Sequence, residues 1–196
     1  MIGFTNKDKF ITQTRMSSVT VTYPRTVTFY IGNYPRKDIL HNLKVKVKSN
    51  LSETTTNKTY VRGGMTDWGL FINDKDFSTF FTDIMDHYKP ALTPDLILGK
   101  EMQVSNAWGN LLKKGEYVHP HTHNSFHGIL YLTKGVPLIF PELEMVFNPE
   151  PGDWIISPPY ILHGTDKIDS EEERINVIFN FDFHDHFRRI NESTED

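Results

Sequence analysis

Apolar and polar residues alternate with period two in short segments near the N-terminus, which is the pattern of half-buried β-strands. Residues 19–21 and 27–31 show it, with Pro24 between them at an expected turn or sheet edge. Residues 43–48 repeat it with lysines on one face, which predicts an edge strand protected by charge. We therefore expect residues 1–60 to form a β extension packed on a core domain of residues 61–196.

The apolar period changes to that of a helix between residues 75 and 88. The apolar residues at helical spacing form one stripe: Phe77, Phe80, Phe81, Ile84, Met85 and Tyr88. Asn73 or Asp74 can cap the start of this segment, and Pro90 ends it. The pattern predicts a helix whose aromatic stripe packs on a sheet.

Beyond Gly99 the chain changes to short strand-like segments separated by glycine and proline. The expected strands are residues 102–112, 127–132, 137–139, 145–147, 153–157 and 174–183. Many short strands at near-regular spacing indicate a β-sandwich or barrel, and the preceding helix would brace one face.

Composition excludes several functional classes. The chain of 196 residues has a formal net charge of −4, so no basic field indicates nucleic acid or anionic lipid. It contains no cysteine, which excludes disulfides, thiolate metal sites and cysteine nucleophiles. We find no signal peptide and no apolar run of the roughly 18 residues that a membrane span needs. We therefore expect a cytoplasmic protein with no membrane partner.

Histidines concentrate in residues 119–127. His119, His121 and His123 alternate, so on an extended strand all three would face one side. Neutral imidazole is a common ligand for iron, zinc, copper and nickel, and two ligands on one strand leave room for a third from elsewhere. The alternative is a stretch of surface histidines.

A second segment adds a histidine and a buried basic residue. Residues 151–163 combine a Gly-Asp turn, an apolar strand and a Pro-rich bend that ends at His163. Arg174 and Asn176 share one face of the following strand, whose other residues are apolar. An arginine inside an apolar barrel requires an anion, and its fork suits a carboxylate. The alternative is a surface ion pair between Arg174 and one of the glutamates at 171–173.

The ordered motifs of residues 61–183 resemble the 2-oxoglutarate/Fe(II)-dependent oxygenases, in particular a branch found in marine bacteria and their phages. The motifs are Val61-Arg-Gly-Gly-Met-Thr-Asp-Trp68, Trp108-Gly-Asn110, Gly115, His119-x-His121, Gly128-Ile-Leu-Tyr131-Leu, Pro151-Gly-Asp153, His163-Gly and Arg174-x-Asn176. The resemblance implies a double-stranded β-helix, a jelly roll of cupin-like architecture. It also implies an enzyme in the cytoplasm, or in the host cytoplasm if a phage encodes it.

The resemblance assigns roles to individual residues. His119, His121 and His163 are implied as ligands of Fe(II). From their positions we expect His123, one pair further along the strand face, and His127, which opens the next strand at a turn, to lie outside the ligand set. Arg174 would hold the far carboxylate of 2-oxoglutarate, with Asn176, Tyr131 and Asn110 as further contacts. His121 stands where the usual triad has a carboxylate, and Asp153 or Asp166 could in principle supply that group. The expected reaction is hydroxylation of a C–H bond in an unidentified substrate.

Two other readings use the same residues. The histidines and the Pro-Gly-Asp turn also resemble a cupin, which would need the metal site but no internal arginine. A non-catalytic barrel for interaction or structure is the third reading, and the N-terminal strands could then pair with a partner or form a homodimer.

Overall fold

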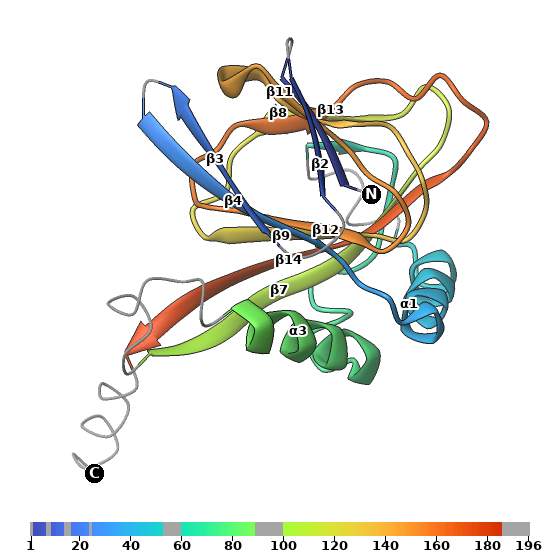
Figure 1. Cartoon of the computed structure of the whole chain (residues 1–196). Helices are drawn as coiled ribbons and strands as arrows, with labels where there is room; N and C mark the ends of the chain where they lie inside the picture. The colour runs from blue at the N-terminus through green and yellow to red at the C-terminus, as the bar shows by residue number, and fades with distance from the viewer. Residues whose placement is uncertain are drawn as a thin grey trace.

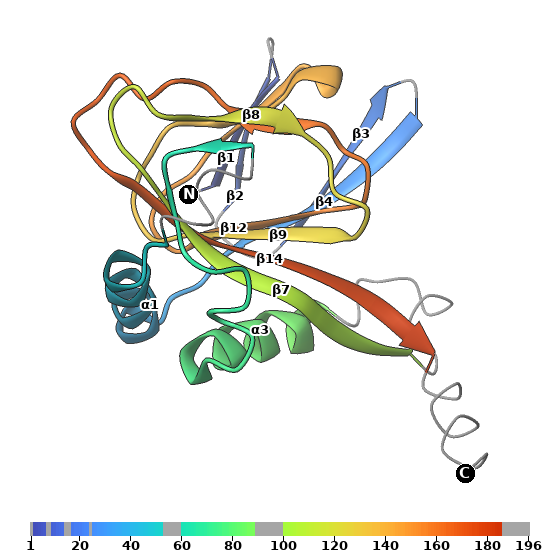
Figure 2. The ribbon, with the colours of Figure 1, turned by 180° about the vertical axis from the view of Figure 1, so that it is seen from behind.

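The chain folds into two antiparallel β-sheets that face each other, with two helices packed on the outside of one of them (Figures 1 and 2). The computed structural model describes residues 2–6, 9–13, 17–23, 25–52, 60–88 and 100–185, with side chains within 27–52, 60–86 and 102–183. One sheet has the strand order β2-β1-β11-β10-β13-β8-β5, and the other has the order β3-β4-β12-β9-β14-β7-β6. None of the described helices combines the length and the apolar character needed to cross a membrane.

The first sheet is built from short strands. They are β1 (Ile2–Asn6), β2 (Lys9–Gln13), β5 (Val61–Arg62), β8 (Tyr117–His121), β10 (Leu138–Phe140), β11 (Met145–Asn148) and β13 (His163–Thr165). A 3-10 turn, Pro141–Leu143, joins β10 to β11.

The second sheet contains the longest strands of the molecule. They are β3 (Ser17–Tyr23), β4 (Arg25–Asn33), β6 (Gly64–Met65), β7 (Lys100–Leu112), β9 (Phe126–Tyr131), β12 (Asp153–Ser157) and β14 (Arg174–Asp185). Every strand expected from the sequence is confirmed to within two residues, except the one expected at residues 43–48. β1, β2, β8 and β13 add to them.

The predicted helix is confirmed as α3 (Lys75–Tyr88). Asp74 caps it: the Phe77 backbone N–H donates to Asp74 Oδ1 at 3.0 Å. The aromatic stripe packs on β14, where the rings of Phe77 and Phe179 lie 5.6 Å apart. The prediction succeeded because the apolar spacing, the cap and the packing face all favour one structure.

The predicted edge strand at residues 43–48 is wrong, because this segment belongs to helix α1 (Lys37–Ser49). Ile39, Leu43 and Val47 recur every four residues and are buried, whereas Val45 is 50% exposed. Short alternation of valine and lysine fits a strand and a helix equally well in this window. Packing on the sheet decided in favour of the helix.

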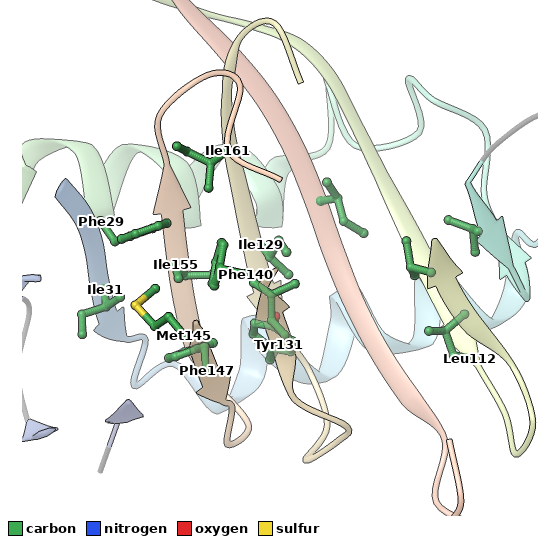
Figure 3. Packing of buried hydrophobic residues seen from close by; sticks show 14 of the residues in the cluster. Phe29, Ile31, Leu112, Ile129, Tyr131, Phe140, Met145, Phe147, Ile155 and Ile161 are labelled. Carbon is green, nitrogen blue, oxygen red and sulfur yellow. The ribbon is translucent and has the colours of Figure 1, made fainter. Parts of the chain in front are cut away.

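Two apolar layers hold these elements together. The inner layer lies between the sheets and includes Phe29, Ile129, Phe140 and Ile155, which point toward one another in Figure 3. The outer layer joins the second sheet to α1 and α3. The second sheet is therefore packed on both faces, and this packing supports its inward-facing residues.

The N-terminal strands lie at the outer ends of both sheets, as the expected β extension would. β4 pairs with β12 from Tyr30↔Ile156 to Asn33↔Asp153, and β1 pairs with β11. Helix α1 in the same segment was not expected. The boundary at residue 60, and a role for these strands in a dimer, stay predictions.

Candidate functional site

A cavity of about 280 Å³ lies between the two sheets and is lined by residues of both. Among the described residues, four buried side-chain atoms have no hydrogen-bond partner: Trp108 Nε1, Asn110 Oδ1, His163 Nε2 and Arg174 Nε. All four residues line this cavity. Because nearly all buried polar groups in proteins are paired, their convergence on one cavity indicates a site for a polar ligand.

Three histidines meet on one wall of the cavity. The nitrogens that His121, His123 and His163 offer lie within 4.8 Å of one another. The Nε2 atoms of His121 and His123 are 3.1 Å apart. Two imidazole nitrogens bound at right angles to one ion, each at about 2.1 Å, would be separated by about 3 Å. The spacing of these two nitrogens therefore fits a shared metal ion.

Backbone carbonyls fix the orientation of two of these rings. His121 Nδ1 lies 2.8 Å from the His119 carbonyl oxygen, and His163 Nδ1 lies 2.9 Å from that of Ile161. Nδ1 must carry the proton to donate in each case, so Nε2 keeps a free lone pair. A hydrogen bond from the distal nitrogen is the usual arrangement around a metal-binding histidine.

Burial keeps these rings neutral. Desolvation, followed by the neighbouring histidines, lowers the pKa of His123 to about 3. The pKa of His163 falls to about 4, again mainly through desolvation, and that of His121 is lowered by the same cause. A neutral imidazole is the form that binds a metal, so protons compete weakly for these nitrogens near neutral pH.

His119 lies outside this cluster, and the strict alternation expected for residues 119, 121 and 123 is wrong. β8 pairs with β13 through His121↔His163 and Val118↔Thr165, and the register shifts between the two pairs. Two residues of β8, His119 and Pro120, thus oppose Gly164 alone on β13, which is a β-bulge. The extra residue places Val118 in the core and leaves His119 exposed. The geometry favours His123 over His119 as the third ligand.

His127 lines the cavity beside the cluster. Its ring stacks on that of His123, with centroids 3.8 Å apart and planes inclined by 13°. Its Nδ1 lies 3.0 Å from Asn180 Oδ1, which fixes the ring. Burial and the adjacent histidines hold the pKa of His127 well below its usual value. His127 is not part of the group of three whose nitrogens could share an ion, and its exclusion from the ligand set stays a prediction.

Arg174 is buried in the same cavity without a carboxylate partner among the described residues. It is 2% exposed, and its Nη2 donates a long hydrogen bond of 3.4 Å to the Tyr131 hydroxyl. The surface alternative is wrong, because Glu171 pairs with Lys114 and Glu173 with Lys48. A buried guanidinium with a free Nε indicates a place for an anion.

Asn176 and Tyr131 surround the guanidinium as expected. When the Asn176 amide is oriented to satisfy both groups, its oxygen accepts from Arg174 Nη1 at 3.1 Å and from Nη2 at 3.3 Å. Arg174 also lies over the Tyr131 ring, 5.2 Å from its centroid. Asn110 pairs with Asn176 across β7 and β14, so it sits at the same level of the cavity. The structure thus brings together all four residues predicted to bind the co-substrate.

Asp153 and Asp166 do not supply a carboxylate to the histidines. Asp153 accepts hydrogen bonds from Asn33 Nδ2 and from the Glu150 backbone N–H, each at 2.8 Å. Asp166 is exposed, and neither residue lines the cavity. The cavity residues that the sequence did not reveal include Trp108 and Asn180. Extending the alternation of Arg174 and Asn176 by two steps along β14 predicts the inward position of Asn180.

Known structures share this fold. A viral collagen prolyl hydroxylase from Paramecium Bursaria Chlorella virus-1, in complex with 2-oxoglutarate, is 13% identical and matches 78% of this chain and 94% of its own, with a TM-score of 0.61. HygX from Streptomyces hygroscopicus, with nickel, 2-oxoglutarate and hygromycin B bound, is 12% identical over 78% and 82% of the two chains, with a TM-score of 0.57. A prolyl-4-hydroxylase from Pseudomonas putida is 13% identical over 78% and 91%, with a TM-score of 0.54.

The fold is that of the 2-oxoglutarate/Fe(II) oxygenases. The expected double-stranded β-helix is therefore confirmed, together with the predicted resemblance at the level of architecture. No protein-family model matches the sequence, and no curated protein matches it. A common fold hosts many chemistries, so the function has to be argued from the site.

Proposed function

We propose that this chain is a 2-oxoglutarate- and Fe(II)-dependent dioxygenase that hydroxylates a C–H bond of its substrate. His121, His123 and His163 would hold the metal, with His123 in the place first assigned to His119. Arg174 would bind the far carboxylate of 2-oxoglutarate, with Tyr131, Asn176 and Asn110 beside it. The observation that carries the proposal is one cavity in which a buried guanidinium, without a carboxylate partner and with a free Nε, accompanies an unpaired His163 Nε2 at a histidine cluster.

The residues of the chain have defined tasks in this scheme. Bound iron would supply the oxygen chemistry, as the metal does in other oxygenases of this fold. The carbonyls of His119 and Ile161 hold two imidazoles with Nε2 toward the ion position. Arg174 orients the dicarboxylate through a fork that matches a carboxylate. Ile129, Leu138 and Ile178 line the cavity and limit access of water.

The direct test is anaerobic titration of 2-oxoglutarate into the Fe(II)-loaded protein. We expect saturable binding and a weak visible charge-transfer band, because the 2-oxo acid would chelate the metal. Binding of one metal without any binding of 2-oxoglutarate would favour the cupin-type reading. Absence of metal binding would favour the non-catalytic barrel.

The choice between His123 and His119 can be tested with a matched pair of substitutions. His123→Ala is expected to weaken Mn(II) or Fe(II) binding by more than about tenfold, since it removes a direct ligand and even the loss of an outer partner costs about 10–100-fold. His119→Ala should bind metal like the wild type, because His119 is exposed and outside the cluster. Isothermal titration calorimetry of both variants measures the difference. The reverse order of affinities would restore His119 to the ligand set.

Three neutral ligands leave the charge of the ion uncompensated, and no carboxylate lines the described part of the cavity. His123→Asp should therefore strengthen binding of the metal alone by roughly tenfold or more, because it brings an opposite charge to the ion. The gain in metal affinity from adding 2-oxoglutarate should be smaller in this variant than in the wild type. Calorimetric titrations with and without 2-oxoglutarate measure both effects. Weaker metal binding in His123→Asp would contradict the charge argument.

A further inference from the structure

Three aromatic residues, Tyr60, Trp68 and Trp108, line the cavity on the side of its histidine cluster. Tyr60 and Trp68 are 57% and 44% exposed and still line the cavity, so they stand where it meets solvent. The Tyr60 ring stacks on that of His121 at 4.8 Å, inclined by 12°. Trp68 packs edge-on against Trp108, with centroids 4.6 Å apart. The entrance to the histidine cluster is therefore aromatic.

The strand register separates this region from the arginine. Along β14 and β7 the inward pairs are Arg174↔Leu112, Asn176↔Asn110 and Ile178↔Trp108. Along the two strands, Trp108 thus lies two inward-facing residue pairs away from Arg174. Its ring is 6.4 Å from that of His123, on the histidine side of the cavity. A dicarboxylate bound by Arg174 would therefore leave Trp108 free to contact a second ligand.

Trp108 presents a hydrogen-bond donor to that ligand. The residue is 4% exposed, and its Nε1–H has no partner among the described residues. Indole offers a donor only, so the missing partner has to be an acceptor. Leaving such a donor unpaired is unfavourable, and a ligand oxygen would satisfy it.

The charged side chains that line the cavity restrict the chemical class of the ligand further. Arg174 is the single ionised side chain among the described residues that line the cavity, and no Asp, Glu or Lys is found there. A cationic substrate would find no counter-charge near the entrance, and a phosphate would find none outside the Arg174 end. Aromatic faces attract both cations and the C–H-bearing face of a saturated ring, and the lack of an acidic side chain among the described lining residues favours the uncharged ring.

We propose that Tyr60, Trp68 and Trp108 form the binding site of the primary substrate, and that the substrate presents there an uncharged saturated ring with an oxygen acceptor. The inference rests on the proposed function, because a hydroxylated substrate has to carry aliphatic C–H bonds close to the histidines. The ring packs on Tyr60 and Trp68, and its oxygen accepts from Trp108 Nε1. A neutral sugar and a cyclic amide share this chemistry.

Indole N–H signals in NMR spectra give a test that is independent of activity. The chain has three tryptophans, and Trp154 lies in the outer apolar layer as an internal reference. The full chain is loaded with Zn(II) and 2-oxoglutarate, then titrated with methyl glucoside and with N-acetylprolinamide. We expect one of these neutral probes to shift the Trp108 Nε1–H signal saturably and to leave that of Trp154 in place. The probe that responds shows whether the substrate ring is that of a neutral sugar or of a cyclic amide.

Charged counterparts and matched variants complete the test. Glucosamine and prolinamide carry a positive charge and should bind at least about tenfold more weakly than their neutral partners. Trp68→Ala should weaken binding of the responding probe about five- to tenfold. Trp108→Phe should also weaken this binding, because phenylalanine retains an aromatic ring but lacks the N–H donor. Ile72→Ala is the control, since Ile72 is 37% exposed and does not line the cavity.

The outcomes separate the two proposals. Failure of 2-oxoglutarate to bind the metal-loaded protein overturns the proposed function. Normal 2-oxoglutarate binding with no saturable shift by either neutral probe overturns the inference about the substrate. Equal binding of charged and neutral probes, or an effect of Ile72→Ala as large as that of Trp68→Ala, overturns it as well.

Discussion

Replacing His163 with alanine should leave the protein folded but unable to retain a metal ion. His163 is 3% exposed, its Nε2 has no partner, and its ring lies 4.7 Å from that of His121. We expect metal affinity to fall by more than about 100-fold, because the loss of an outer partner of a ligand already costs about 10–100-fold. Metal analysis after dialysis and calorimetric titration with Mn(II) measure the loss.

The fold should survive this substitution, because a neutral imidazole at the cavity wall contributes little to the apolar core. Circular dichroism and thermal melting of the metal-free proteins check this point. His41→Ala is the matched control, since His41 is an exposed histidine of α1. A His163→Ala protein that holds one ion as tightly as the wild type would remove the metal centre from the proposal.

The parts of the site that could be predicted from the sequence lie on long, regular elements. Arg174 and Asn176 were expected on one inward face because β14 is a twelve-residue strand with unbroken alternation there. Helix α3 was expected because its stripe covers three turns and begins at a capping aspartate. In such elements local propensity, period and packing agree, so the sequence alone is sufficient.

The parts that could not be predicted depend on local departures from regularity. The bulge in β8 inserts one residue opposite β13 and exchanges the roles of His119 and His123. A period of two is inverted by one extra residue, and the alternating histidines themselves do not mark the bulge. Pro120 within β8 is the one available signal, since proline is confined to edges and bulges of sheets.

Short strands could not be predicted from the sequence for a different reason. β13 spans three residues, His163–Thr165, which is too few to display a period. Its position follows from pairing with β8 and β10, a contact between distant parts of the chain. The strand that carries His163 therefore becomes visible only in three dimensions, although His163 itself was singled out as a candidate ligand from the motif that surrounds it.

Replacing Arg174 with glutamine should abolish 2-oxoglutarate binding while iron stays bound. Arg174 is 2% exposed and has no carboxylate partner among the described residues, so a dianion in the cavity would be its counter-charge. Loss of such a desolvated pair costs about 2–5 kcal/mol, or roughly 30- to 5,000-fold in affinity. Calorimetric titration of 2-oxoglutarate into the Mn(II)-loaded protein without oxygen measures the change.

Two further variants make this result specific. Arg174→Lys should bind 2-oxoglutarate more weakly than the wild type, because an ammonium group offers a point charge where arginine offers a fork. Gly135→Ala should also weaken binding, because its added Cβ would lie 2.8 Å from Arg174 Cγ and displace the side chain. Arg36→Gln is the control, since Arg36 is an exposed arginine paired with Asp38.

Thermal stability gives an independent readout of the same charge. A buried guanidinium without a counter-charge destabilises the ligand-free fold, so Arg174→Gln should not lower the melting temperature of the metal-loaded protein. Addition of 2-oxoglutarate should raise the melting temperature of the wild type through linkage and leave that of the variant unchanged. Equal stabilisation of both proteins would show that 2-oxoglutarate does not contact Arg174. The cupin-type reading, which needs the histidines but no internal arginine, would then replace the oxygenase.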